Sequence, residues 1–177
     1  LLERLWGEHI HLGFYPSMER NIDFRKAKVQ FVHELVKWSG LDTLPKGSRI
    51  LDVGCGIGGS SRILAKYYGF NVTGITISPA QVKRARELTP DGLNCSFLVM
   101  DALDLKFEDG SFDGVWSVEA GAHMNDKNKF ADEMLRILRP GGYLALADWN
   151  SRDLKAYPPS FIEKLVLKQL LEQWVHP

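Results

Sequence analysis

The sequence predicts an α/β fold in which a mainly parallel sheet carries helices on both faces. Strand-like and helix-like segments alternate along the chain, which is the pattern that parallel sheets with helical connections produce. A glycine-rich turn follows the first strand-like run, as is typical of the ligand-binding edge of such sheets. Three divisions are predicted: residues 1–45, 46–150 and 151–177.

A helix is predicted first, over residues 24–38, ending at Gly40 and with an apolar face made by Val29, Val32, Leu35 and Val36. His33 lies beside that face and is expected to be solvated. Five strands are expected over residues 50–53, 71–76, 95–100, 114–118 and 143–147, with a helix over 61–68. The turn Arg139-Pro-Gly-Gly142 leads into the fifth strand.

A final helix is predicted after residue 160, where Ser160 and Glu163 fit a capping box. Its apolar face is made by Leu167, Leu170, Leu171 and Trp174, opposite Lys164, Lys168 and Glu172. Such a face packs into a core, or forms a cap over an apolar ligand or a membrane surface.

The glycine-rich turn predicts a cofactor site, because Gly54, Gly56 and Gly58 let the backbone approach a ligand closely. The spacing also fits dinucleotide-binding folds, but the second strand ends in Thr76 and not in an acid for a ribose hydroxyl. Asp52 would repel a pyrophosphate and attract a cationic amino group. Asp101-Ala102, after the third strand, is placed for an adenine amino group. These features favour S-adenosylmethionine over a nicotinamide dinucleotide; the alternative is a tight turn with Asp52 as a helix-terminal acid.

The composition indicates one soluble domain of 177 residues, 45% of them hydrophobic, with a formal net charge of zero. Balanced charge argues against nucleic acid as a partner. Without a run of 18 apolar residues the segment is not expected to span a membrane. Cys55 and Cys95 are expected to be buried thiols in a reducing compartment. Because the chain opens at Leu1 without methionine, we expect a further segment upstream.

Four segments resemble the cofactor motifs of the tocopherol methyltransferase family of class I S-adenosylmethionine-dependent methyltransferases: residues 51–62, 74–79, 115–124 and 139–142. The resemblance implies the Rossmann-like methyltransferase fold, whose final antiparallel strand pair is absent from this chain. It assigns 1–45 to a lid and helix, 46–150 to the cofactor-binding core and 151–177 to the start of a substrate cap. The implied cofactor residues are Asp52, Gly54, Cys55, Gly56, Gly58, Thr76, Ile77, Gln81, Asp101, Ala102, Ser117 and Tyr15.

The resemblance also implies methyl transfer to a ring carbon of a prenylated hydroquinone, in tocopherol and plastoquinone synthesis. A phenol is a poor carbon nucleophile until it is deprotonated, so a base near the ring is expected. His123 is the first candidate, because it follows the fourth strand, and Glu119 is placed to orient it or to bind a hydroxyl. The alternative is that His123 only holds a loop. Residues 6–15 are expected to form a lid that leaves His11 or Tyr15 near the methyl group.

The His9-x-His11 pair lacks a third ligand at suitable spacing, so no metal site is predicted. The expected partner is a lipophilic quinol, with peripheral membrane contact and no nucleic acid. The expected location is inside the cell, on the cytoplasmic side of a plasma or thylakoid membrane, or in the chloroplast of a photosynthetic eukaryote. The alternatives are a related methyltransferase, such as one acting on gamma-tocopherol, and a cofactor-binding domain without catalysis.

Overall fold

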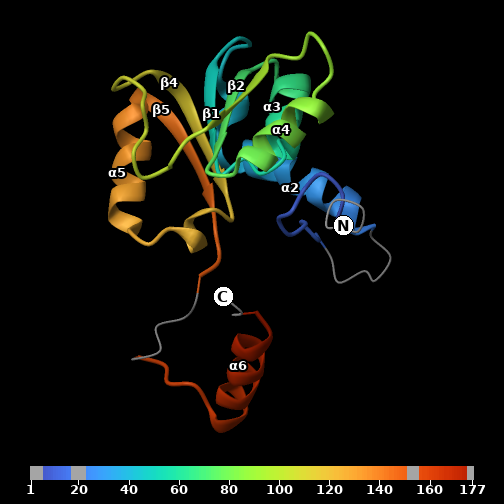
Figure 1. Cartoon of the computed structure of the whole chain (residues 1–177), viewed down its shortest axis with the longest axis vertical. Coiled ribbons are helices and arrows are strands. Elements are labelled where there is room, and N and C mark those ends of the chain that lie inside the picture. The colour runs from blue at the N-terminus through green and yellow to red at the C-terminus, as the bar shows by residue number, and fades with distance from the viewer. Residues whose placement is uncertain (1–5, 17–22, 151–155, 175–177) are drawn as a thin grey trace.

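The computed structural model describes residues 6–16, 23–150 and 156–174 (Figure 1). It contains a five-stranded sheet in the order β3-β2-β1-β4-β5, in which every adjacent pair is parallel. The strands are β1 (Arg49–Val53), β2 (Asn71–Thr76), β3 (Cys95–Val99), β4 (Phe112–Val118) and β5 (Leu138–Ala147). The predicted fold class and strand number are therefore confirmed.

The helices are α2 (Phe24–Ser39), α3 (Gly59–Tyr68), α4 (Pro79–Leu88), α5 (Lys127–Ile137) and α6 (Phe161–Trp174), with short turns η1 (Leu41–Thr43) and η2 (Gly121–His123). Figure 1 shows α2, α3 and α4 on one side of the sheet and α5 on the other. The sequence analysis did not assign α4 and α5 individually. Each of these helices begins after an N-cap residue that is typical in sequence, Ser78 for α4 and Asp126 for α5. Both side chains accept a hydrogen bond from the backbone N–H three residues later.

The two faces of the sheet bury separate apolar clusters. On the α2 and α3 side, Ile50 and Trp116 pack with Val32, Val36 and Leu64. On the α5 side the cluster contains Leu51, Val53, Ile75, Val115 and Met134. Neighbouring residues of β1 thus point to opposite faces, and both faces are apolar because helices cover both. The sheet is fixed from both sides, so the loops at its carboxyl edge start from rigid strands.

The Arg139-Pro-Gly-Gly142 segment is not a turn before a strand, as predicted, but an irregularity within β5. Phe112 pairs with Leu138 and Gly114 pairs with Tyr143, so the β5 chain takes extra residues between the two pairs. Gly141 has a φ of 75°, a conformation that glycine adopts without strain. An Arg139–Asp113 ion pair of 2.7 Å holds this bulge against β4.

Two side chains lie differently from the prediction. His33 is not solvated but half-buried, with its Nδ1 2.8 Å from the Tyr68 hydroxyl oxygen and its ring against Tyr67. Of the two cysteines, Cys55 is buried as expected, whereas Cys95 is only partly buried because β3 is an edge strand. Both are free thiols.

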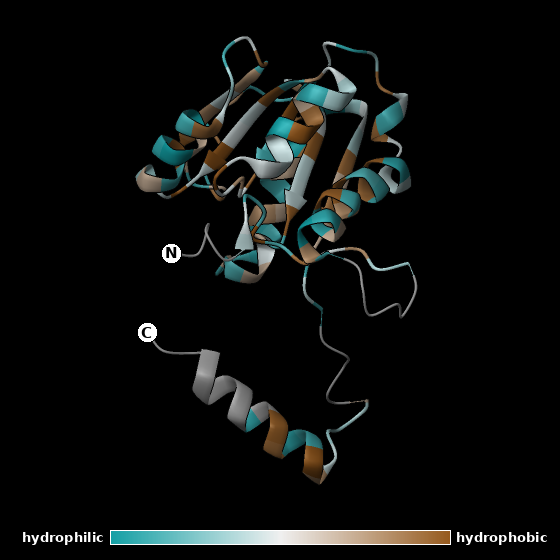
Figure 2. Ribbon diagram, turned by 90° about the vertical axis from the view of Figure 1, so that its right-hand side faces the viewer, coloured by the Kyte–Doolittle hydropathy of each residue, from teal (hydrophilic) through white to brown (hydrophobic). Residues whose placement is uncertain are grey.

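The capping box before α6 is confirmed. Ser160 N–H donates to Glu163 Oε2 at 2.7 Å, and Glu163 N–H donates to Ser160 Oγ at 3.3 Å. Figure 2 shows apolar residues on the described part of α6, and Phe161 and Ile162 are 82% and 72% exposed. The predicted apolar face, made by Leu167, Leu170, Leu171 and Trp174, involves side chains outside the described residues. Within the described ranges, no helix is both long and apolar enough to cross a membrane.

Candidate functional site

The glycine loop, residues 54–58, leaves the carboxyl end of β1 and meets the loops that follow β2 and β4. Gly54, Gly56 and Gly58 have φ values of 79°, 55° and 81°. The amides of Gly54 and Cys55 both donate to the Ile75 carbonyl oxygen at 2.9 Å, which ties the loop to β2. A Cβ built on Gly54 would overlap Ala120, whereas the nearest atom to one on Gly56 is 3.9 Å away. The backbone at Gly56 therefore faces the open space that a cofactor needs.

Asp52 lies under this loop and is 2% exposed. Among the residues that the structure describes, its hydrogen-bond partner is Ser61 in the first turn of α3, whose hydroxyl donates to Oδ2 at 2.5 Å. Burial raises the pKa of the Asp52 carboxyl to about 7, although the Ser61 hydrogen bond works in the opposite direction. A cation bound at the loop would favour the ionised form, so the expected attraction for an amino group fits this environment.

The end of β2 and the start of α4 carry Thr76 and Gln81, two of the cofactor residues that the resemblance implies. Thr76 is buried, and its hydroxyl lies 2.6 Å from Gln81 Oε1, across the start of α4. The neighbouring Ile77 is 74% exposed at the same edge. The structure thus places Thr76, Ile77 and Gln81 together beside the glycine loop. Their role toward a ligand stays a prediction.

The loop after β3 carries Asp101, which is exposed, and Ala102, which is buried. One carboxylate oxygen of Asp101 accepts from the Leu103 N–H at 2.9 Å, so the acid also shapes its own turn. The adenine role predicted for this pair remains open.

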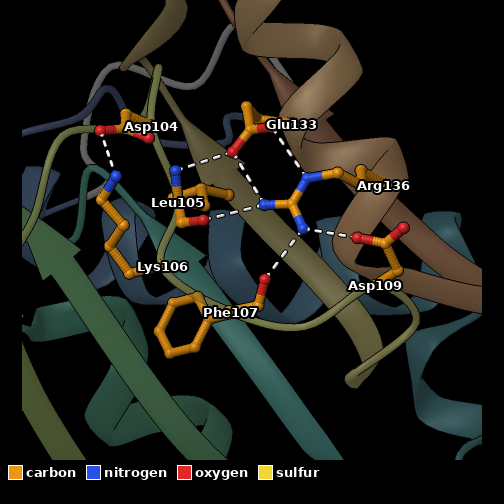
Figure 3. Close-up of polar contacts among 7 residues, drawn as sticks. All are labelled: Asp104, Leu105, Lys106, Phe107, Asp109, Glu133 and Arg136. Carbon is orange, nitrogen blue, oxygen red and sulfur yellow. Dashed lines mark hydrogen bonds and ion pairs between the residues drawn. The ribbon is translucent and has the colours of Figure 1, made fainter.

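Arg136 of α5 fixes that loop, as Figure 3 shows. All five of its N–H donors are used: two on Glu133, one on Asp109 and one each on the carbonyl oxygens of Leu105 and Phe107, at 2.7–2.9 Å. The Leu105 N–H in turn donates to Glu133 at 2.7 Å. A planar guanidinium is suited to this because its donors are held in one rigid fork. Arg136 was not predicted as a site residue, because no local sequence pattern marks it.

Residues 6–15, which we call the strap, cross the carboxyl edge of the sheet close to the glycine loop. Glu8 forms an ion pair of 2.6 Å with Arg62, a residue of α3 that also donates to the Ile57 carbonyl oxygen within the loop. The buried Lys28 of α2 donates to the carbonyl oxygens of Trp6 and His9 at 3.1 and 2.8 Å. Arg62 and Lys28 were not predicted as site residues; both act through strap contacts that are distant in sequence.

His9 and His11 lie together in the buried part of the strap. Nδ1 of His11 is 2.7 Å from the Leu12 carbonyl oxygen, which only accepts, so this nitrogen carries the hydrogen. In the neutral ring Nε2 is then the acceptor, and it lies 3.2 Å from His9 Nδ1. Burial lowers the pKa of both rings, that of His9 to about 3. His11 therefore has no free basic nitrogen in this arrangement, which argues against the predicted catalytic role.

The carboxyl end of β4 carries three predicted residues in different situations. Ser117 is fully buried, and its hydroxyl donates to the Val53 carbonyl oxygen at 3.0 Å, so its side chain joins β4 to β1 and does not face a ligand. His123 is exposed at the end of η2. Among the described residues no hydrogen bond joins Glu119 to His123. Glu119 instead accepts from the Leu12 N–H at 3.0 Å, so the expected orienting role is not seen.

Tyr15, at the end of the strap, is 49% exposed. Across residues 6–16, 23–150 and 156–174, no group of three His, Cys, Asp or Glu side chains is arranged to hold a metal ion. The candidate site is therefore one edge of the sheet, bounded by the strap, the glycine loop and the loops after β2, β3 and β4.

Comparison with known proteins agrees with this geometry. Residues 51–146, which run from β1 into β5, match the model of a methyltransferase domain family. This chain belongs to that family. The match confirms the predicted fold, and the loops described above are those of a methyltransferase domain.

Three relatives show the range of this similarity. A Synechocystis sp. protein described as 2-methyl-6-phytyl-1,4-hydroquinone methyltransferase is 62% identical over 177 residues, all of this chain and 56% of that protein. The chloroplastic tocopherol O-methyltransferase of Arabidopsis thaliana is 43% identical, covering 88% of this chain and 48% of that protein. The solved Haemonchus contortus phosphoethanolamine N-methyltransferase 2, in complex with S-adenosyl-L-methionine, has a TM-score of 0.65 and 28% identity over 78% of this chain and 31% of its own.

The chain thus spans about half the length of these two curated relatives. The predicted resemblance to the tocopherol methyltransferases is confirmed. The sequence resembles the cyanobacterial 2-methyl-6-phytyl-1,4-benzoquinol enzyme in segments that include His-Ile-His-Leu-Gly13 and Ala147-Asp-Trp-Asn150, and the 62% identity to the Synechocystis sp. protein agrees with this resemblance.

Proposed function

We propose that this chain is the cofactor-binding part of an enzyme that transfers a methyl group from S-adenosylmethionine to a ring carbon of a prenylated hydroquinone. The observation that carries the proposal is the open glycine loop over the buried Asp52, in a chain 62% identical to a hydroquinone methyltransferase. A pyrophosphate is disfavoured here because a carboxylate lies directly beneath the loop.

The cofactor supplies a methyl group on a cationic sulfonium, which a carbon nucleophile can attack. The glycine loop and Asp52 would hold its amino-acid end, since Asp52 is buried and has only one hydrogen-bond partner among the described residues. Thr76 and Gln81, joined at 2.6 Å, would bind the ribose hydroxyls. Asp101 and Ala102 would hold the adenine on the loop that Arg136 fixes.

His123 is the base that we assign to the acceptor hydroxyl. It is exposed at the edge of the sheet, directly after the β4 loop, so an acceptor can reach it. Histidine is the side chain most often used to remove a proton near neutral pH. His11 is the weaker candidate, because its ring nitrogens face Leu12 and His9.

A lipophilic acceptor fits the outer side of the strap. Ile10, Leu12 and Phe14 alternate with the half-buried or buried His11 and Gly13, and they are 52%, 47% and 38% exposed. Trp149, just beyond β5, is 63% exposed. Such apolar side chains at one edge would pack against a prenyl tail or lie at a membrane surface. We therefore propose peripheral contact with a photosynthetic membrane, where a prenyl quinol would be dissolved.

The test is methyl transfer from labelled S-adenosylmethionine by the full-length protein against a panel of prenyl quinols and tocopherols. Methylation of 2-methyl-6-phytyl-1,4-benzoquinol is the expected result. Preference for gamma-tocopherol would instead indicate a tocopherol methyltransferase, the kind of enzyme that the Arabidopsis thaliana relative represents. Cofactor binding without any transfer would support the non-catalytic alternative. Calorimetry with S-adenosylhomocysteine and NAD checks the cofactor independently, and binding of NAD alone would contradict the proposal.

A further inference from the structure

We propose that Glu119 is a positioning residue that latches the strap across the carboxyl edge of the sheet. The functional meaning of this latch rests on the proposed function, because a strap here matters for catalysis only if the edge holds a cofactor. The latch itself is a property of the folded chain. It replaces the role of Glu119 in orienting His123, which the observed contacts do not support.

The backbone of Glu119 is unusual. Among the described residues it is the one non-glycine residue with a positive φ, 51°. Its N–H donates to the Ala147 carbonyl oxygen at 2.8 Å, so the end of β5 holds it in place directly after β4. A residue with a Cβ is disfavoured in this left-handed region, where glycine or asparagine is usual. An acid at such a position indicates that its side chain is needed there.

The side chain of Glu119 binds Leu12, a strap residue that lies outside the strands. Its Oε1 accepts from the Leu12 N–H at 3.0 Å, which joins segments 107 residues apart. The carbonyl oxygen of Leu12 lies 2.7 Å from His11 Nδ1. Both backbone polar groups of Leu12 are thus satisfied by side chains, so this residue needs no neighbouring strand to satisfy them.

Glu119 also completes the attachment of the strap. The other anchors come from helices α3 and α2 on one side of the sheet: Arg62 pairs with Glu8, Lys28 donates to the carbonyl oxygens of Trp6 and His9, and the Phe14 N–H donates to the Ala27 carbonyl oxygen. Glu119 is the anchor on the β4 side of the glycine loop. Burial lowers the pKa of the Lys28 ammonium, and the negative charge of Glu119 acts in the opposite direction. Attraction between these opposite charges favours the closed arrangement. Without it the strap would be held from one side only.

The experiment compares Glu119→Ala, Glu119→Gly and Glu119→Gln in the full-length protein without cofactor. Chymotrypsin cleavage after Leu12 and Phe14, which are exposed, reports strap opening. The alanine and glycine variants should be cut roughly 3- to 10-fold faster than wild type, as the loss of one hydrogen bond predicts. The glutamine variant should stay within about twofold, because its amide oxygen still accepts from Leu12. Glu108→Ala, an exposed acid elsewhere, is the control.

Thermal unfolding separates the backbone from the side chain. The glycine variant should have a Tm about 2–4 °C above the alanine variant, since both lose the carboxylate but only glycine relieves the left-handed strain. A mere loss of packing would instead destabilise both alike. Affinity for S-adenosylhomocysteine should fall roughly 3- to 10-fold in the alanine variant and little in the glutamine variant.

Wild-type cleavage rates in the alanine and glycine variants would overturn the latch. A glutamine variant as labile as the alanine variant would overturn it too. Failure of the wild-type protein to bind S-adenosylhomocysteine would overturn the proposed function instead, and the cleavage rates, measured without cofactor, would still decide the latch.

Discussion

Replacing Asp52 by asparagine tests the electrostatics beneath the glycine loop, because this carboxyl is buried and paired with one hydroxyl. Burial raises its pKa from 3.8 to about 7. That difference corresponds to about 4 kcal/mol, at about 1.4 kcal/mol for each tenfold change in proton affinity. Since the folded-state pKa lies above the unfolded value, the protonated carboxyl stabilises the fold at low pH. This contribution is lost as the pH rises from about 4 through about 7.

Urea denaturation of wild type and Asp52→Asn across this pH range measures the effect. The wild-type free energy of unfolding, relative to the variant, should fall by about 4 kcal/mol between about pH 4 and pH 8. Asp104→Asn is the matched control, because its carboxylate is 61% exposed and paired only at the surface. Parallel pH profiles for wild type and Asp52→Asn would refute the reasoning, since they would mean that Asp52 has the same pKa in both states.

A second readout of the same group uses the cofactor product. If the amino group of S-adenosylhomocysteine approaches Asp52, it favours the ionised carboxylate, and binding at pH 7 should release about half a proton. Calorimetry in buffers of different ionisation enthalpy measures this number. Asp52→Asn should abolish the release. An unchanged release in the variant would assign it to another group.

Four further outcomes follow from the geometry. Gly54→Ala should cost more than Gly47→Ala in urea unfolding, because both have positive φ but only the first meets Ala120; equal losses would contradict this. Arg136→Lys should cost about 2–3 kcal/mol, since an ammonium cannot replace the five-donor fork; a loss below about 0.5 kcal/mol would refute it. By NMR titration the pKa of His9 should lie far below 6.5. The stabilisation that its neutral ring gives the fold should be fully present above about pH 6.5 and lost as the pH falls toward 3. A pKa near 6.5 would mean that the strap is open. His123→Ala should lower kcat by about 100- to 10,000-fold with little change in cofactor affinity; turnover within a few-fold of wild type would remove it as the base.

Local features of the sequence predicted the sheet and its ligand-binding edge. The strand over 71–76 is observed as β2 (Asn71–Thr76) without change, because alternating and apolar runs bounded by glycine carry their own signal. Gly54, Gly56 and Gly58 have the positive φ values that the glycine-rich turn requires. The capping box before α6 is likewise a local pattern, and it forms as predicted.

Contacts between distant segments were decided only by the tertiary structure. A serine near the end of a strand gives no sign in the sequence that its hydroxyl will be buried against the neighbouring strand, as that of Ser117 is against Val53. The acceptor role of Glu119 toward Leu12 depends on a strap 107 residues away. His11 has no free basic nitrogen because one ring nitrogen contacts His9 and the other contacts the Leu12 carbonyl oxygen. The sequence by itself therefore determined where a cofactor edge would form, because backbone conformation and burial are encoded locally. Which side chains remain available there was determined by packing, since each polar group takes whatever partner the fold brings within reach.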